Sequence, residues 1–304
     1  MGVIRNINKI LVSLDLTAID ANMIEYASFL SRTLKVDKIY FVHAIQAYEL
    51  GRKEKKLDEI RRTLNQNIRD EIDNIVNHRF GEKTKTEVIT RIEDENAAQG
   101  VLDVIREKEI DLTLIGLKYG EDREGKYAKE ISAKAGSDLL LVPEEAENKI
   151  EHIFCAVDFS EESEEAFQKA LDLSKTNGAR LSCYYVYDIR KVYFPGATDQ
   201  SLATLEKKFN KKYEKFLSRF DLHESDVTPR FNANEKLDNS AEKIYNQAYD
   251  DKADLIIVGT KGQVGSVISL LGNITENLIH IDTEIPVMII KNHKKKNRWS
   301  MFRR

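Results

Sequence analysis

The sequence predicts an α/β protein with two tandem doubly wound domains, each built on a parallel five-stranded sheet with helices on both faces. Short, continuous apolar runs alternate with longer segments of helical periodicity, and apolar strands of this kind are typical of buried parallel sheets. The alternation occurs twice, and 304 residues with 41% hydrophobic content provide two cores of ordinary size. Repeated strand–helix–strand order therefore favours two doubly wound sheets.

The first half gives this order most clearly. One helical segment carries Ile24, Ala27, Leu30 and Leu34 on one face, and the run Ile10, Leu11, Val12 before it is apolar throughout. The expected strands cover residues 7–15, 37–44, 84–92, 112–115 and 139–142, and the expected helices cover residues 18–34, 51–77, 95–108 and 127–135.

The second half repeats the first at a nearly constant offset. Asp158 ends an apolar strand 143 residues after Asp15 does so, and Gly259 stands 143 residues after Gly116. The last strands, 139–142 and 287–290, are 148 residues apart, so the second half has five extra residues in the preceding loop. A repeat of this length indicates two homologous domains. We expect these domains at residues 1–147 and 148–292, followed by a basic tail at 293–304. Within the second domain, a charged helix with an apolar stripe is expected at residues 205–220.

Composition excludes several classes of protein. The net charge of −4 gives no global field for DNA, and no apolar run approaches the roughly 18 residues that a membrane-spanning helix needs. The polar start of the chain lacks a signal-peptide core, so we expect a cytoplasmic protein. Cys155 and Cys183 fall inside expected strands as small buried hydrophobes, and no spacing predicts a metal site.

A glycine-punctuated loop in the second half is the clearest candidate site. A buried strand ends at Val258, and Gly259, Gly262 and Gly272 follow at the spacing Gly-x2-Gly-x9-Gly. Glycine lets the backbone approach a ligand closely, and the helix expected from Asn273 presents free N–H groups that suit an anion. The pattern indicates a phosphate site at the carboxyl edge of the sheet. The alternative is a plain strand–loop–helix connection with glycines at its turns.

On these residues the chain resembles the universal stress protein family, as a member with two such domains in tandem. The resemblance covers about residues 7–142 and 150–290. It implies a Rossmann-like fold of the adenine nucleotide alpha hydrolase type. The family's nucleotide-binding members carry the same three-glycine spacing followed by Ser or Thr, and Asn273 stands at that last position here. An amide can still donate to a phosphate oxygen and is a good helix cap.

The resemblance further implies that the second domain binds ATP, with Mg²⁺ on its phosphates. It assigns the nucleoside contacts to Asp158, Val186, Val258 and Gly259, and the phosphate contacts to Gly262, Gly272, Asn273 and Ile274. Asp158 has a structural alternative, because an acid at a strand end can cap the following helix; Ser160 could do the same.

The first domain departs from this pattern. Gly125 is the best counterpart of Gly272, yet it comes four residues early. The acids Glu121, Asp122 and Glu124 crowd the loop, which disfavours phosphate. We expect this half not to bind ATP in the family manner.

The resemblance implies a stress-response or signalling protein that acts through nucleotide-dependent conformation or association. The fifth strands, 139–142 and 287–290, would pair in a homodimer or in a pseudo-dimer within the chain. Two alternatives stay open: a slow ATP hydrolase, against which stands the lack of a paired base and nucleophile, and a nucleotide-free interaction protein. The basic tail, with Trp299 among its lysines and arginines, could contact a membrane or another protein, or be a solubilising terminus.

Overall fold

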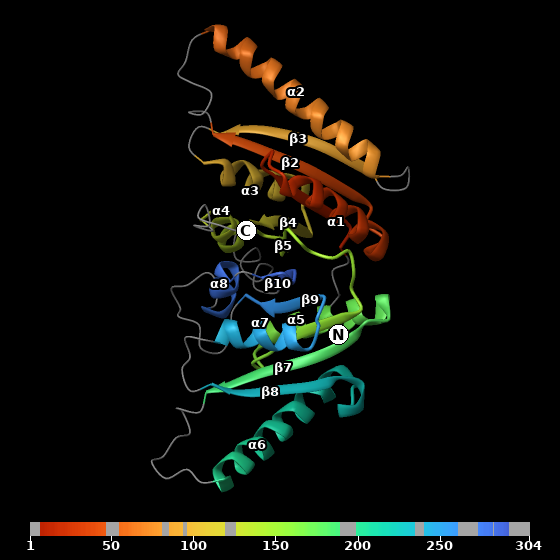
Figure 1. The fold of residues 1–304 in the computed structure, drawn as a ribbon, viewed down its shortest axis with the longest axis vertical. Coiled ribbons are helices and arrows are strands. Elements are labelled where there is room, and N and C mark those ends of the chain that lie inside the picture. Colours follow the sequence, from red (N-terminus) through yellow and green to blue (C-terminus); the bar gives the residue numbers. More distant parts are fainter. Residues whose placement is uncertain are drawn as a thin grey trace, which may run out of the picture. The chain divides into compact units, whose positions relative to one another are not determined.

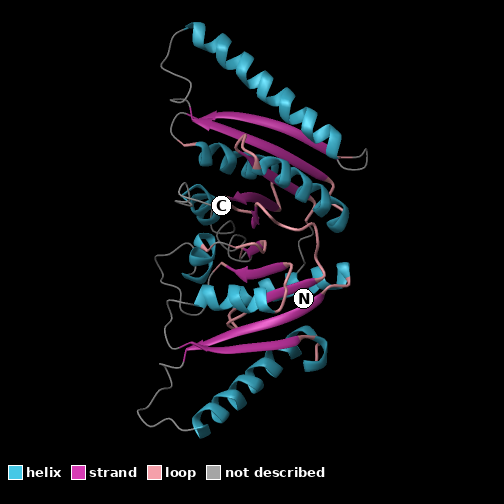
Figure 2. Cartoon of the chain, in the orientation of Figure 1, coloured by secondary structure: helices cyan, strands magenta, loops and turns pink. Residues whose placement is uncertain are grey.

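The computed structural model describes residues 7–46, 55–80, 85–93, 96–118, 126–188, 199–234, 240–260, 273–281 and 283–291. The chain divides into two compact units, and the main division lies between Asn148 and Lys149. Within each unit, strands and helices alternate along the chain, as Figures 1 and 2 show.

The first unit is a parallel sheet in the order β3-β2-β1-β4-β5. Helix α1 contacts α2 and helix α3 contacts α4, which gives the two helical layers of a doubly wound fold. Figure 1 shows α2 lying alongside β3. The strands are β1 (Lys9–Leu14), β2 (Lys38–Gln46), β3 (Lys85–Glu93), β4 (Leu112–Leu117) and β5 (Asp138–Pro143); the helices are α1 (Ile19–Leu34), α2 (Lys55–Arg79), α3 (Ala97–Lys108) and α4 (Lys126–Lys134).

The second unit repeats this arrangement as a parallel sheet in the order β10-β9-β6-β7-β8. Its strands are β6 (His152–Ala156), β7 (Arg180–Asp188), β8 (Thr228–Asn234), β9 (Leu255–Gly259) and β10 (Val287–Ile290); its helices are α5 (Glu161–Asn177), α6 (Asp199–Leu217), α7 (Ser240–Asp250) and α8 (Asn273–His280). The helix expected at 205–220 ends at Leu217, and the last three residues of that range form the 3-10 helix η3 (Ser218–Phe220). A second 3-10 helix, η4 (Glu224–Asp226), precedes β8. The predicted fold class is confirmed.

Equivalent hydrogen bonds occur in both units at the offset found in the sequence. The Asp111 carboxylate accepts the backbone N–H groups of Asn8 and Lys9, both at 3.0 Å. The Asp254 carboxylate accepts the N–H groups of Glu151 and His152, both at 2.8 Å. Each acid therefore ties the residue before the fourth strand of its unit to the start of the first strand.

Backbone conformation repeats in the same way. A left-handed residue follows the strand-end acid, another ends the first helix, and a third precedes the fourth strand of each unit. The pairs are Leu16 and Phe159, Lys35 and Gly178, and Glu109 and Lys252. Non-glycine residues seldom adopt this conformation, so three shared positions are a specific mark of duplication.

The cores lie on both faces of each sheet. Ile10, Leu11 and Val12 of β1 are fully buried, as expected for a parallel strand covered on both sides. Cys155 and Cys183 are register partners on β6 and β7, and burial raises the pKa of both thiols above the ordinary value. They pack as small apolar side chains, as predicted. Among the helices that the structure describes, none is long and apolar enough to span a membrane.

Candidate functional site

The candidate site lies at the carboxyl edge of the second unit's sheet, where parallel strands end together. Strand β6 lies between β7 and β9, with Cys155 paired to both Cys183 and Ile257. Asp158 follows the end of β6, and Gly259 is the last residue of β9. In open α/β sheets ligands bind at this edge, beside the strand where the order reverses. Here that strand is β6, the first of the unit.

Three further predicted residues reach the same edge. Val186 lies near the end of β7, and Val258 precedes Gly259 in β9. Asn273 is the first residue of α8, and a crossover helix begins at the edge where its preceding strand ends. The topology therefore brings Asp158, Val186, Val258, Gly259 and the start of α8 to one edge of one sheet.

Burial separates the roles that these residues can play. The Val258 side chain is 3% exposed and belongs to the core, so only its backbone can meet a ligand. Asp158, Val186 and Gly259 are half-buried and reach the surface. This combination suits a ligand held by one carboxylate and by strand-end backbone.

The remaining predicted phosphate contacts lie outside the described part of the chain or have side chains that are not described. Gly262, Gly272 and Lys261 lie outside the described residues. The backbones of Asn273 and Ile274 belong to α8, and their side chains are not described. Their roles stay predictions.

A tight turn sets the conformation of Asp158. Ser160 donates to Asp158 Oδ1 from its backbone N–H at 3.0 Å and from its Oγ–H at 2.5 Å. Phe159, between them, is left-handed with φ +62°. Ser160 is also the N-cap of α5, since its Oγ accepts the N–H of Ser163 at 3.2 Å. Ser160 therefore caps α5, and the Asp158 carboxylate accepts two hydrogen bonds from this capping residue.

The strand-end acid of the first unit has a second carboxylate close to it. Asp15 accepts a hydrogen bond from Thr17 Oγ1 at 2.6 Å, as Asp158 does from Ser160. A second carboxylate, Asp20, accepts the N–H groups of Asp15 at 3.3 Å and Leu16 at 2.8 Å. Burial raises the pKa of Asp20 to about 6, against the lowering effect of these two hydrogen bonds.

Ser163 stands at the position of the second unit that matches Asp20, 143 residues later, and its hydroxyl donates to the backbone oxygen of Ser160 at 3.0 Å. The second unit therefore has no carboxylate at the position from which Asp20 holds the turn of the first unit. The acids that follow the turn of the second unit lie in the first residues of α5: Glu161, Glu162, Glu164 and Glu165.

Side chains of the first unit also occupy its own edge. Lys118, two residues beyond Gly116, forms an ion pair with Asp15. Tyr127 of α4 shares a 2.6 Å hydrogen bond with Ser13 of β1, and burial raises the pKa of Tyr127 to about 12. In the first unit, therefore, a lysine pairs with the strand-end acid and a phenol pairs with β1. The second half has Lys261 at the position that matches Lys118, outside the described residues.

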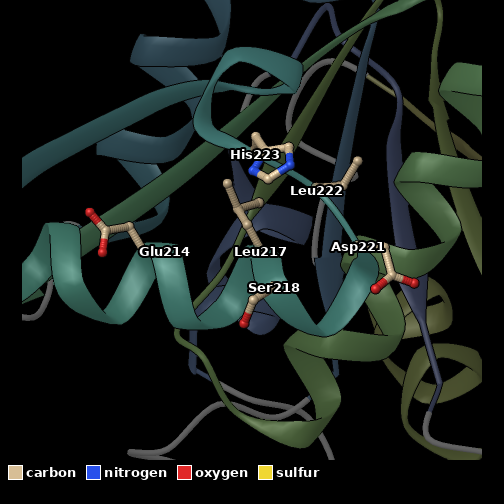
Figure 3. A pocket seen from close by; sticks show the side chains of 6 residues that line it. All are labelled: Glu214, Leu217, Ser218, Asp221, Leu222 and His223. Carbon is tan, nitrogen blue, oxygen red and sulfur yellow. The ribbon is translucent and has the colours of Figure 1, made fainter.

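One surface hollow lies away from this edge. It has a volume of about 400 Å³ and is lined by Glu214, Leu217, Ser218, Asp221, Leu222 and His223 (Figure 3). These residues end α6 and precede β8, so the hollow belongs to the opposite edge of the sheet. It contains none of the residues predicted from the sequence. Among the described residues, no group of three acids, histidines or cysteines could hold a metal ion.

Comparison with known proteins finds one family for the second half of the chain. Residues 149–291 match the sequence model of the universal stress protein family. A universal stress protein of Methanocaldococcus jannaschii is 26% identical over 151 residues, which are 49% of this chain and 87% of that protein. The second half of the chain is therefore similar to the universal stress protein family.

Solved structures extend the likeness of fold to both halves. A universal stress protein from Archaeoglobus fulgidus superposes with a TM-score of 0.64 at 16% identity, covering 94% of this chain and 96% of that one. A putative universal stress protein from Pseudomonas aeruginosa gives a TM-score of 0.65 at 13% identity, covering 99% of each. At these identities the likeness concerns the fold.

Sequence reasoning overlooked Phe159 and Ser163. Phe159 was hidden because a left-handed backbone at a non-glycine residue leaves no compositional mark. A signal for Ser163 was present, since Asp20 and Ser163 occupy equivalent positions and differ in charge.

Proposed function

We propose that the second unit binds an adenine nucleotide, ATP carrying Mg²⁺, at the carboxyl edge of its sheet, and that the first unit does not. The observation that carries this proposal is that Asp158 follows β6 and Gly259 ends the neighbouring β9, at the carboxyl edge of the second unit's sheet where the three-glycine loop begins. In the first unit the strand-end acid Asp15 is paired with Lys118 and lies beside a second acid, Asp20. The three-glycine spacing of the family's nucleotide-binding members occurs only in the second half.

Each residue has a role that its chemistry supports. Asp158 would accept hydrogen bonds from the hydroxyl or amino groups of the nucleoside, because a carboxylate is an acceptor only. Val186 would contact the adenine ring, and Val258 and Gly259 would line the nucleoside with backbone. Gly262, Gly272, Asn273 and Ile274 would hold the phosphates at the start of α8, where N–H groups and the helix dipole favour anions.

The magnesium ion would travel with the nucleotide. Within the part of the chain that the structure describes, no acidic cluster is available to bind it. Mg²⁺ commonly keeps most of its waters and binds through substrate phosphates, so the protein need not supply a full set of ligands.

Nucleotide binding would act by changing conformation or association, in keeping with a stress-response or signalling role. Pairing of the fifth strands, 139–142 and 287–290, stays a proposal, as does a cytoplasmic location. The tail at 293–304 lies outside the described residues, so its contact with a membrane or a protein is likewise a proposal.

Isothermal titration of the full chain with Mg²⁺–ATP tests the function. Gly272→Val should abolish binding, because a side chain there would obstruct the backbone approach to phosphate. Gly125→Val, at the matching glycine of the first half, is the control and should leave binding unchanged. Absence of binding by the unmodified chain at millimolar nucleotide would refute the proposal.

A further inference from the structure

We propose that Phe159 is a positioning residue of this site: its ring, packed between β7 and α6, holds the left-handed turn that orients the Asp158 carboxylate. The inference rests on the proposed function and names the residue that controls the geometry of the binding acid. It concerns a side chain that faces the core side of the turn, so Phe159 acts on the ligand through its neighbours in sequence.

The left-handed turn at Phe159 needs contacts from outside the turn to stabilise it. Phe159 has φ +62°, a conformation that costs an L-residue energy because Cβ crowds the backbone. Such a conformation persists where surrounding contacts fix it, and it is frequent at functional sites. Residues on either side, Asp158 and Ser160, are joined by the two hydrogen bonds that set the carboxylate. A change at φ of Phe159 would separate these partners.

An aromatic group supplies the support. The Phe159 ring lies 4.9 Å from Tyr185 of β7, 5.3 Å from Phe216 of α6 and 6.0 Å from Phe209 of α6, measured between centroids. Tyr185 and Phe209 are stacked at 5.4 Å. Edge and offset contacts at these separations are favourable, so the ring is held from both a strand and a helix.

The first unit holds its equivalent turn by other means. Leu16 has nearly the same backbone, with φ +61°, yet its side chain is 43% exposed. There the buried Asp20 carboxylate accepts the Leu16 N–H and fixes the turn. The second unit has a ring in place of that carboxylate. It therefore holds the turn by packing the ring against β7 and α6.

Substitution by the residue of the first unit tests the inference. Phe159→Leu should weaken Mg²⁺–ATP binding about fivefold, since a misplaced Asp158 loses the advantage of a charged hydrogen bond. Phe159→Tyr keeps the ring and should restore affinity to within about twofold. Phe220→Leu is the matched control. Its ring is half-buried and belongs to the same aromatic group through Phe167 and Phe216, so it should lower stability and leave affinity unchanged.

A double-mutant cycle separates positioning from general packing. In the Asp158→Asn background, Phe159→Leu should have little further effect on affinity, because the carboxylate on which Phe159 acts is gone. An equal loss in both backgrounds, or an equal loss in Phe220→Leu, would overturn the inference.

Hydrogen exchange gives a readout that needs no nucleotide. The Ser160 amide should exchange faster in Phe159→Leu than in Phe220→Leu at equal global stability, because its acceptor has moved. If the unmodified chain bound no nucleotide, the proposed function would fail and this exchange would still decide the role of Phe159. Unchanged protection at Ser160 would contradict that role.

Discussion

Ser160 donates two hydrogen bonds to one oxygen of Asp158, from its N–H at 3.0 Å and from its Oγ–H at 2.5 Å. Because Ser160 also caps α5, the carboxylate is tied to a rigid helix before any ligand arrives. A preoriented acceptor lowers the ordering cost of binding. Ser160 rather than Asp158 caps α5, so the proposed ligand role of Asp158 does not compete with capping.

Replacing the charge of Asp158 while keeping its acceptor tests the ligand role. Asp158→Asn retains an oxygen for the Ser160 donors, so we expect the fold to remain intact. Affinity for Mg²⁺–ATP should fall about five- to tenfold, because hydrogen bonds to charged groups are stronger by roughly 1 kcal/mol. Calorimetric titration measures the change. Asp15→Asn is the control and should bind like the unmodified chain; equal effects of the two variants would argue against a site confined to the second unit.

Asp20→Asn should make the stability of the first unit less dependent on pH. Burial raises the folded pKa of Asp20 to about 6, above its ordinary value of 3.8, so the ionised form is disfavoured in the folded state. The ionised group lowers stability above about pH 6, and this penalty disappears as the pH falls towards 3.8. Asparagine has one acceptor oxygen for the two N–H donors, so the variant loses a hydrogen bond at every pH. Chemical denaturation should therefore show the stability of the variant, relative to the unmodified chain, rising by about 1–2 kcal/mol from pH 4 to pH 7.5. A stability difference that stayed constant between these pH values would exclude this cause.

His152 should make the second unit sensitive to acid. Its Nδ1 lies 2.9 Å from the Arg180 guanidinium, which can only donate, and Nε2 lies 2.8 Å from Ser182 Oγ. Burial, and then the Arg180 charge, lower the pKa of His152 below 6.5. The unfolded chain therefore binds the proton more readily, and stability is full above about pH 6.5 and declines below it.

Denaturation midpoints between pH 7.5 and 5 test this account of His152. His152→Gln should remove the contribution of His152 to the loss of stability between pH 7.5 and 5, since glutamine does not titrate in this range. Arg180→Met should reduce the slope by removing the cation beside the ring. An unaltered pH profile in both variants would assign the acid sensitivity to other groups.

The helix ends at Lys35 and Gly178 provide a reciprocal test of the internal repeat. Both residues are left-handed, at φ +53° and φ +66°, and both end the first helix of their unit. Lys35→Gly should stabilise the fold by about 0.5 kcal/mol. The substitution relieves the strain of a left-handed lysine, and this gain is partly offset by the larger conformational entropy that glycine loses on folding. Gly178→Lys should destabilise by about 1 kcal/mol through strain alone, because nothing lies within 4 Å of the added Cβ. Thermal denaturation should show opposite signs, and equal signs would exclude a shared conformation.

The fold could be predicted well because its signals are local and repeated. Apolar runs predict the strands, and the constant offset between Asp15 and Asp158 predicts the repeat from sequence alone. Boundaries were less accurate, as at Leu217, where α6 gives way to a 3-10 turn without a change in composition.

The site was predictable only in part. The strand-end position of Asp158 follows from sequence, whereas its hydrogen bonds with Ser160 depend on the left-handed Phe159. The pairing of Lys118 with Asp15 joins residues 103 positions apart, which no local pattern indicates. Contacts between distant residues arise from the register of the sheet, so the occupied edge of the first unit became visible only in the folded chain.

The stoichiometry of ATP binding tests the central claim most directly. The full chain should bind one Mg²⁺–ATP per polypeptide in a calorimetric titration, because only the second half carries the three-glycine loop. Two equivalents per chain would contradict the proposal that the first unit does not bind ATP. No binding would contradict the nucleotide site in the second unit.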